Sequence, residues 1–323
     1  MSLYLIVATD HGLVVCEADG AHWRPVHRGL ERNPLTSVIA REGVILAGSR
    51  QGIFRSDDLG QNWVPASDGL SISHVRWLAY HPEISDFELA GTEPAAIFVS
   101  RDGSGHWRSC EEVEQMREQY GWRLPYSPEA GCVRGFAVQS SRAYAAVEDG
   151  CVLISDGGEH WRLAEGSRGH LDHRPASGFI HSDVHSITVH PSSSDLVYAP
   201  TGGGFYVSQD GAKTWELLYS CYVRAVWIDP DDAQHMILGP ADGVDWNGRI
   251  EETRDGGRTW QHAARGLTAP WRNHMVERFT QVGERLLAVL SNGELIETAL
   301  EELNWEPVLN DLHGVNAVTT LEV

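Results

Sequence analysis

The segment Ser208–Trp215, SQDGAKTW, ends a strand-like run and has the composition of a tight turn. The same turn comes back as SDDLGQNW, SRDGSGHW, SDGGEHW and TRDGGRTW, which end at Trp63, Trp107, Trp161 and Trp260. Two less regular copies, CEADGAHW and ETALEELNW, end at Trp23 and Trp305. Successive Trp residues are 40, 44, 54, 54, 45 and 45 positions apart. A repeat of this length, with strand-like runs between the turns, is typical of β-propeller blades.

Each repeat is predicted to contain four strands with alternating apolar residues. In one copy SHVRWLAYHP (73–82), FELAGTEP (87–94) and AAIFVSRDG (95–103) supply the first three strands, and a short piece after the Trp supplies the fourth. The chain starts on a second strand and ends on an extra first strand, HGVNAVTTLEV (313–323). We therefore expect a single all-β domain over residues 1–323, a seven-bladed propeller. Its C-terminal strand should complete blade 1 (residues 1–33 plus 313–323) and close the ring.

The repeated turns also have a chemical logic. The Asp carboxylate can accept turn N–H groups, the Gly supplies a positive φ, and the Trp offers an apolar face to a neighbouring blade. The pattern S/T-x-D-x-G-x-x-W resembles the Asp-box, or BNR, repeat of sialidase-like propellers over nearly the whole chain. That resemblance implies the fold rather than one function, because such propellers include glycosidases, sortilin-like receptors and photosystem II assembly factors. Bacterial BNR-repeat proteins of this kind often carry the label glycosyl hydrolase from the repeat alone. We interpret the turns themselves as structural.

The amino-acid composition and net charge argue against some classes of binding partner. The chain of 323 residues has 25 Lys and Arg against 45 Asp and Glu, a formal net charge of −20, which argues against a nucleic-acid or anionic-membrane partner. No apolar run reaches the length of a membrane span, and Met1–Thr9 is interpreted as a strand rather than a signal peptide. Five scattered cysteines indicate reduced thiols, so we expect a cytoplasmic protein. Nothing in the composition sets an oligomeric state.

The long insertions are expected on one face of the propeller. Residues 116–131, 167–180 and 268–273 connect blades, and residues 240–248 enlarge a second-to-third turn. In a four-stranded blade these connections lie on the face opposite to the repeated turns, here called the top face. Long loops on a rigid scaffold are where sites usually lie, and the resemblance to sialidase-like enzymes implies the same face.

First strands should line the central channel, with the residue after a recurrent Val pointing into it. Alignment predicts a ring of Ser37, Arg76, Arg134, His185, Arg224, Glu277 and Asn316. Arginines bind carboxylate or phosphate in bidentate fashion, so this ring suggests a small anionic ligand, such as a carboxylate-bearing molecule or an acidic sugar. The alternative is a polar, water-filled channel in which the arginines pair with carboxylates such as Glu93 and Asp183.

Histidines near the top of the channel are further candidates. The segment HSDVH places His181, Asp183 and His185 at alternate positions, which share a face if the segment is a strand. These residues are candidates for a divalent metal site, for general-base or ligand-binding roles, or for solvated side chains. His74 and His274, which start two first strands, are candidate ligand contacts.

Aromatic residues of the long top loops form another candidate set. Trp122, Trp246 and Trp271, with Tyr126, suggest a stacking wall for a sugar ring if they are exposed. Otherwise they anchor the loops.

The sialidase resemblance gives specific expectations. It implies that Arg76, Arg134 and Arg224 take the place of the arginine triad, and Tyr222 with Glu277 that of the nucleophile pair. However, the Arg-Ile-Pro segment of that family is absent and the strand LYLIVAT has no Arg, which argues against sialidase activity.

A lyase fits these groups better. It would abstract a proton beside a carboxylate, with His185 and His181 as bases and Tyr126 or Tyr222 as acid. A sugar-directed hydrolase is a related interpretation. The alternative from another class is a non-enzymatic propeller that docks an acidic protein segment.

Overall fold

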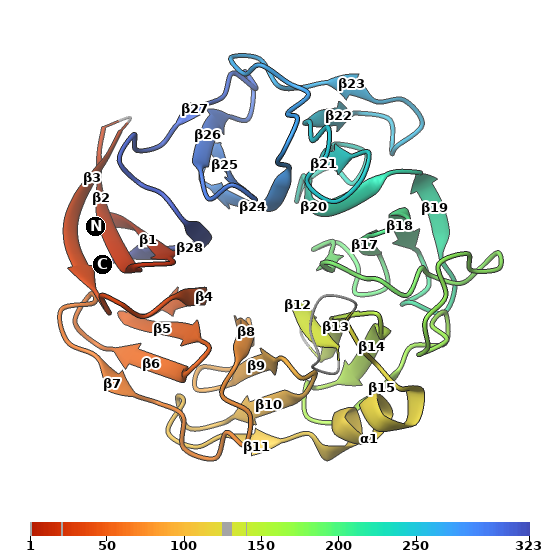
Figure 1. Ribbon diagram of the computed structural model, residues 1–323, viewed down its shortest axis with the longest axis horizontal. Coiled ribbons are helices and arrows are strands. Elements are labelled where there is room, and N and C mark those ends of the chain that lie inside the picture. The colour runs from red at the N-terminus through yellow and green to blue at the C-terminus, as the bar shows by residue number, and fades with distance from the viewer. Residues whose placement is uncertain (1, 21, 125–130, 140) are drawn as a thin grey trace.

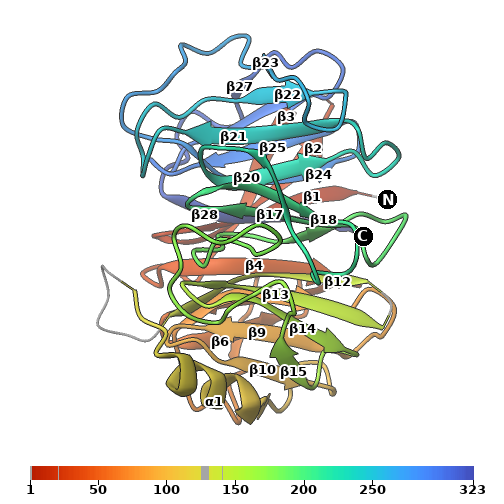
Figure 2. The same ribbon diagram turned by 90° about the vertical axis from the view of Figure 1, so that its right-hand side faces the viewer.

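The computed structural model describes residues 2–20, 22–124, 131–139 and 141–323. Within these residues the chain forms seven four-stranded antiparallel sheets, which stand as blades around a central axis (Figure 1). The predicted seven-bladed β-propeller is therefore confirmed. Figure 2 shows the ring from its side, with the single helix of the described residues at its rim.

Each blade has four strands, which are ordered from the axis to the rim. In the order of blades 1 to 7, the strands are as follows. The innermost strands are β28 (Val315–Glu322), β4 (Leu35–Arg41), β8 (Val75–Tyr80), β12 (Cys132–Gln139), β16 (Thr188–Val189), β20 (Tyr222–Ile228) and β24 (Val276–Val282). The second strands are β1 (Leu3–Thr9), β5 (Val44–Ser49), β9 (Glu88–Thr92), β13 (Arg142–Glu148), β17 (Val197–Thr201), β21 (Met236–Ala241) and β25 (Arg285–Leu290). The third strands are β2 (Gly12–Asp19), β6 (Gly52–Ser56), β10 (Ile97–Ser100), β14 (Cys151–Asp156), β18 (Gly204–Ser208), β22 (Glu251–Thr253) and β26 (Leu295–Ala299). The outer strands are β3 (His22–Gly29), β7 (Val64–Pro65), β11 (Arg108–Ser109), β15 (Trp161–Leu163), β19 (Glu216–Tyr219), β23 (Gln261–His262) and β27 (Glu306–Pro307).

The two ends of the chain close the ring. β28 pairs with β1 in antiparallel register from Leu3 opposite Glu322 to Thr9 opposite Val315. Both termini consequently lie in blade 1 (Figure 1). The expected closure by the C-terminal strand is confirmed.

The hydrophobic core lies between blades rather than within one sheet. In the described part of the chain, each of seven apolar clusters combines side chains of two neighbouring blades. The Trp residues of the repeated turns take part in these contacts, as the cluster containing Trp107 with Leu46 and Ile53 of blade 2 illustrates. Each blade therefore covers the apolar face of the next, and the ring is held together by burial between blades.

The repeated turns share one hydrogen-bond pattern. At Ser208 the hydroxyl accepts from the Ala212 N–H at 2.8 Å, and the Asp210 carboxylate accepts from the Thr214 N–H at 2.9 Å. Equivalent bonds recur in the turns that start at Ser56, Ser100 and Thr253. Gly211 has φ of 74°, as expected for a turn glycine. The structural interpretation of the turns is confirmed in these copies.

One segment differs from its prediction as a loop. The helix α1 (Glu111–Tyr120) runs into the insertion that we placed at residues 116–131. Its first turn carries Glu111, Glu112 and Glu114, whose negative charges interact favourably with the positive end of the helix dipole. The helix ends at Gly121, which has the left-handed conformation. The described residues contain no helix that is long and apolar enough to cross a membrane.

Trp107 gives a direct test of packing between blades. Its ring is 1% exposed and its Nε1–H donates to the Ala66 carbonyl of the neighbouring blade at 2.9 Å. We expect Trp107→Ala to lower the free energy of unfolding by about 3–5 kcal/mol, measured by guanidinium denaturation. Trp107→Phe should cost less, because it keeps most of the packing. Trp246→Ala is the control. Because Trp246 is 56% exposed, its replacement should lower the free energy of unfolding by less than about 0.5 kcal/mol. Equal losses for Trp107→Ala and Trp246→Ala would contradict the packing argument.

Candidate functional site

A β-bulge or register shift recurs on the innermost strands of six blades. The register with the second strand skips one residue at Thr36, Arg76, Arg134, Glu277 and Asn316, and slips at Arg224. In blade 5 the pairing is irregular between the bridge at Val184 and the start of β16. The extra residue of a bulge stays out of the ladder and its side chain is re-aimed. Five of the seven aligned residues line one axial cavity: Arg76, Arg134, His185, Glu277 and Asn316.

One member of the predicted ring is wrong. Blade 2 contributes Thr36, whereas Ser37 is 2% exposed and lies outside the channel. Leu35, which is fully buried, occupies the place of the recurrent Val of the other blades. The alignment was therefore shifted by one residue in blade 2.

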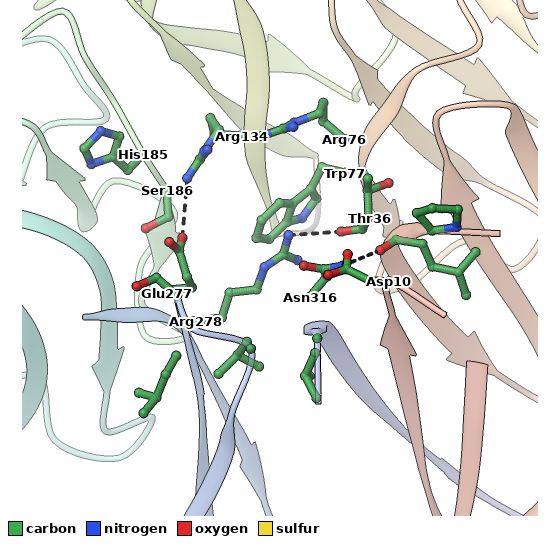
Figure 3. Close-up of a pocket in the computed structure, with 18 of the residues that line it drawn as sticks. Asp10, Thr36, Arg76, Trp77, Arg134, His185, Ser186, Glu277, Arg278 and Asn316 are labelled. Atoms are coloured by element: carbon green, nitrogen blue, oxygen red, sulfur yellow. Dashed lines mark hydrogen bonds and ion pairs between the residues drawn. The ribbon is translucent and has the colours of Figure 1, made fainter. Parts of the chain in front are cut away.

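The ring surrounds an axial cavity of about 450 Å³ at the top face (Figure 3). Its mouth is bordered by second-to-third turns, which contribute Asp10, Arg50 and Asn292. Its charged lining consists of four arginines and two carboxylates: Arg50, Arg76, Arg134, Arg278, Asp10 and Glu277. In a protein with a net charge of −20, this lining concentrates positive charge at the axis.

The arginines predicted from the sequence already have carboxylate neighbours. Arg76 lies 3.4 Å from Glu93, and Arg134 lies 3.5 Å from Glu148 and 3.7 Å from Glu277. Arg224 pairs with Glu277, and with Asp245 at 3.3 Å, and is not part of the cavity lining. These pairs match the alternative interpretation of a polar channel. Glu93 and Glu148 are each only 6% exposed and lie outside the lining, so Arg76 and Arg134 form the wall that faces the cavity.

Arg278 is a cation of the cavity wall that the sequence alignment missed. Its guanidinium lies 3.9 Å from the centre of the Trp77 ring and donates to the Thr36 carbonyl at 3.2 Å (Figure 3). Burial and the nearby Arg134 lower the pKa of Arg278 to about 9, so it remains charged at pH 7. At a bulge two consecutive residues take the place of one. Glu277 and Arg278 accordingly both line the cavity, although the alignment assigned one residue to each blade.

His185 is fixed by contacts on both ring nitrogens. Its Nδ1 lies 2.7 Å from the Val223 carbonyl, and its Nε2 lies 3.0 Å from Asp183 Oδ1 and 3.3 Å from the Tyr222 hydroxyl. Burial raises the pKa of Tyr222, and Arg224 Nη2 donates to the same hydroxyl at 3.3 Å. The structure thus brings His185, Tyr222 and Asp183 together. The in-ring partner of Asp183 is this histidine and not an arginine.

His181 does not join this group. The segment around His181–His185 is irregular, with an isolated bridge at Val184, so its alternate residues do not share the face of a strand. His181 stacks on His173 with 5.1 Å between ring centres, and its Nδ1 accepts from the Asp183 N–H. The predicted metal set of His181, Asp183 and His185 is therefore not brought together. Glu148, Asp183 and His185 instead each offer an atom within 4.8 Å of the others, a geometry that could hold a metal ion.

The remaining candidate residues lie away from the cavity. The His74 ring lies 3.9 Å from the Glu93 carboxylate, and burial lowers the pKa of this histidine. His274 stacks on Trp271 at 5.0 Å, and burial lowers its pKa as well. Neither histidine lines the cavity.

The expected wall of exposed aromatic residues is wrong for two of its members. Trp122 is 1% exposed and donates to the Gly169 carbonyl at 2.6 Å, and Trp271 is 8% exposed, so both anchor loops. Trp246 is exposed but does not line the cavity, and Tyr126 lies outside the described residues.

Comparison with known proteins supports the fold. A protein assigned as a 6-phosphogluconolactonase from Bacteroides uniformis is similar over 99% of both chains, with a TM-score of 0.65 and 13% identity. YCF48 bound to a D1 peptide is similar over 87% of this chain and 83% of its own, with a TM-score of 0.58 and 16% identity. An ancestral GH74 enzyme is similar over 89% of this chain, with a TM-score of 0.63 and 17% identity, and this chain spans 38% of its length.

These similarities define the class of protein as a seven-bladed β-propeller, whose neighbours include both enzymes and binding propellers. No family model and no curated protein matches the sequence. The Asp-box family therefore stays a prediction.

Glu277 is expected to stabilise the cationic channel. Its carboxylate contacts Arg134 and Arg224, and its side chain is 24% exposed. Glu277→Gln should lower the free energy of unfolding by about 2 kcal/mol, less than for a fully buried pair, because it leaves the two guanidiniums without their shared carboxylate. Urea denaturation measures the loss, which added salt should reduce. Glu306→Gln is the control, as this carboxylate is 62% exposed. An unchanged Glu277→Gln would show that the pairs contribute nothing to stability.

Proposed function

We propose that the axial cavity binds a small anionic molecule through a carboxylate or a similar group. The observation that carries this proposal is Arg278, whose guanidinium faces the cavity between the Trp77 ring and the Thr36 carbonyl. Among the described residues, no carboxylate oxygen forms an ion pair with it within 4.0 Å. A charged group held away from water is stabilised by an opposite charge, so an anionic ligand suits this position.

Neighbouring groups support a ligand of modest size. Arg76 lines the cavity beside Arg278, and Arg50 lies at its mouth on an exposed turn. Asn316, whose amide donates to Asp10 and to the Leu35 carbonyl, borders the same space. A cavity of about 450 Å³ is in the range of small-molecule sites and suits a sugar acid better than a long peptide.

Two solved neighbours frame the alternatives of enzyme and binding propeller. The GH74 protein is an enzyme, and YCF48 has a bound D1 peptide. For the present chain, docking of an acidic protein segment is the competing interpretation of the same cationic cavity. A panel of small anions and an acidic peptide separates the two.

Arg278→Met is the decisive variant. Binding of glucuronate, citrate, inorganic phosphate and hexaglutamate is measured by calorimetry on the full chain. We expect glucuronate or citrate to bind the wild type, and Arg278→Met to weaken that binding roughly tenfold to a hundredfold, the usual effect of removing a charged hydrogen bond. Methionine keeps the length of the side chain and its packing on Trp77.

Arg101→Met is the matched control. Arg101 also stacks on an aromatic ring, that of Phe87 at 4.5 Å, but its side chain is 52% exposed and remote from the cavity. Equal weakening by both variants, or no binding of any small anion, would overturn the proposal. Binding of hexaglutamate alone would favour the docking function.

A second candidate function is acid–base catalysis of the lyase type. The 3.3 Å contact between the Tyr222 hydroxyl and His185 Nε2 favours it, because it pairs a candidate acid with a candidate base at the edge of a cationic cavity.

Tyr222→Phe tests this second candidate. The variant should keep its affinity for glucuronate and lose elimination on an oligouronate, measured by the ultraviolet absorbance of the unsaturated product. Absence of turnover by the wild type, or full turnover by Tyr222→Phe, would exclude Tyr222 as the acid.

A further inference from the structure

We propose that the chain holds a divalent first-row transition-metal ion between Glu148, Asp183 and His185. One oxygen or nitrogen of each residue lies within 4.8 Å of those of the other two, and His185 Nε2 is 3.0 Å from Asp183 Oδ1. Zinc binds imidazole nitrogen and carboxylate oxygen at about 2.0–2.2 Å. Ligand atoms around such an ion are therefore about 3–4 Å apart, close to the spacing of this cluster.

The orientation of His185 presents a lone pair to the two carboxylates. A backbone carbonyl only accepts hydrogen bonds, so the contact of 2.7 Å between Nδ1 and the Val223 carbonyl requires the proton on Nδ1. In the neutral ring Nε2 is then an acceptor that faces the cluster. The side chain is 1% exposed, and a carbonyl that fixes the far nitrogen is typical of metal-ligating histidines.

Asp183 supplies an independent indication of a cation. Its Oδ1 is buried and accepts no hydrogen bond from the described part of the chain. The Tyr222 hydroxyl can satisfy the His185 ring but leaves this oxygen without a donor. Two acceptors 3.0 Å apart are unfavourable unless a proton or a metal ion lies between them. A metal ion satisfies both atoms at once.

The backbone around the cluster is shaped for this carboxylate. A Cβ on Gly202 would lie 2.2 Å from Asp183 Oδ2, so any larger residue there would displace the carboxylate. Glu148, at the end of β13, is 6% exposed, and Arg134 contacts it from the channel side at 3.5 Å. The buried Glu148 carboxylate and the half-buried Asp183 carboxylate would compensate the charge of a divalent ion.

The donor set selects the kind of metal. Mg²⁺ and Ca²⁺ prefer sites made of oxygen alone, whereas an imidazole with two carboxylates suits Zn²⁺ or Mn²⁺. Metal binding at Nε2 uses the lone pair that a general base needs. The proposal therefore makes His185 a ligand rather than the base of the lyase candidate. It rests on residues other than Arg278 and stands apart from the anion proposal.

The test uses the full chain after dialysis against EDTA. Zinc chloride or manganese chloride is added, and binding is measured by calorimetry and, after desalting, by elemental analysis. We expect one ion per chain, bound more tightly than magnesium or calcium. Asp183→Asn and Glu148→Gln, which keep the shapes of the side chains, should each weaken the affinity at least about tenfold. In manganese spin-resonance spectra, wild type should show nitrogen coupling that His185→Gln loses.

His181→Gln is the matched control, because His181 is also buried and only four positions away but lies outside the cluster. It should bind the metal like the wild type, and circular dichroism and the unfolding midpoint confirm that each variant folds. Wild-type protein that retains no zinc or manganese would overturn the proposal, as would His181→Gln weakening the affinity as much as Asp183→Asn. Arg278→Met should keep its metal, so failure of either proposal is recognisable separately.

Discussion

Closure of the ring by β1 and β28 is the constraint on which the other features depend. Their ladder joins residues more than 300 positions apart, such as Leu3 and Glu322. Each blade buries its apolar face only against a neighbour, so blades 7 and 1 are covered only when the ring closes. Closure also sets the width of the channel, because seven innermost strands must share one axis. The bulges on these strands are the local response, and they place polar side chains where the strands converge.

The innermost strands bring together at the axis charged residues that lie far apart in the sequence. Arg76, Arg134 and Arg224 each meet a carboxylate, and the Glu277 carboxylate connects two of them. Such pairs hold guanidiniums in place without removing all their donors, since an arginine has five N–H groups. Arg278 differs, because an aromatic ring and a carbonyl hold it in the channel. Among the described residues, Arg278 thus faces the cavity without an ion-paired carboxylate, an arrangement that suits an anion.

Repetition made the fold predictable, and local irregularity limited the prediction of the site. The spacing of the Trp residues gave the seven blades, and the surplus strand at 313–323 gave the closure. Of the seven residues aligned on the recurrent Val, five line the cavity, and Ser37 and Arg224 do not. Ser37 failed because Leu35 replaces that Val, and Arg278 was missed because a bulge exposes two neighbours to the channel. Burial of Trp122 and Trp271 depends on how loops fold back onto the blades, which strand periodicity does not encode.

His185 belongs to both the lyase candidate and the proposed metal site, and its contacts favour the role of metal ligand. A general base needs a lone pair directed at substrate, yet Nε2 faces the Asp183 carboxylate and the Tyr222 hydroxyl. With the Val223 carbonyl fixing the other nitrogen, the ring has little freedom to turn Nε2 away from Asp183 and Tyr222. A ligand role needs no such turn. An ion at this point would add positive charge beside Arg134, which contacts Glu148 and lines the cavity.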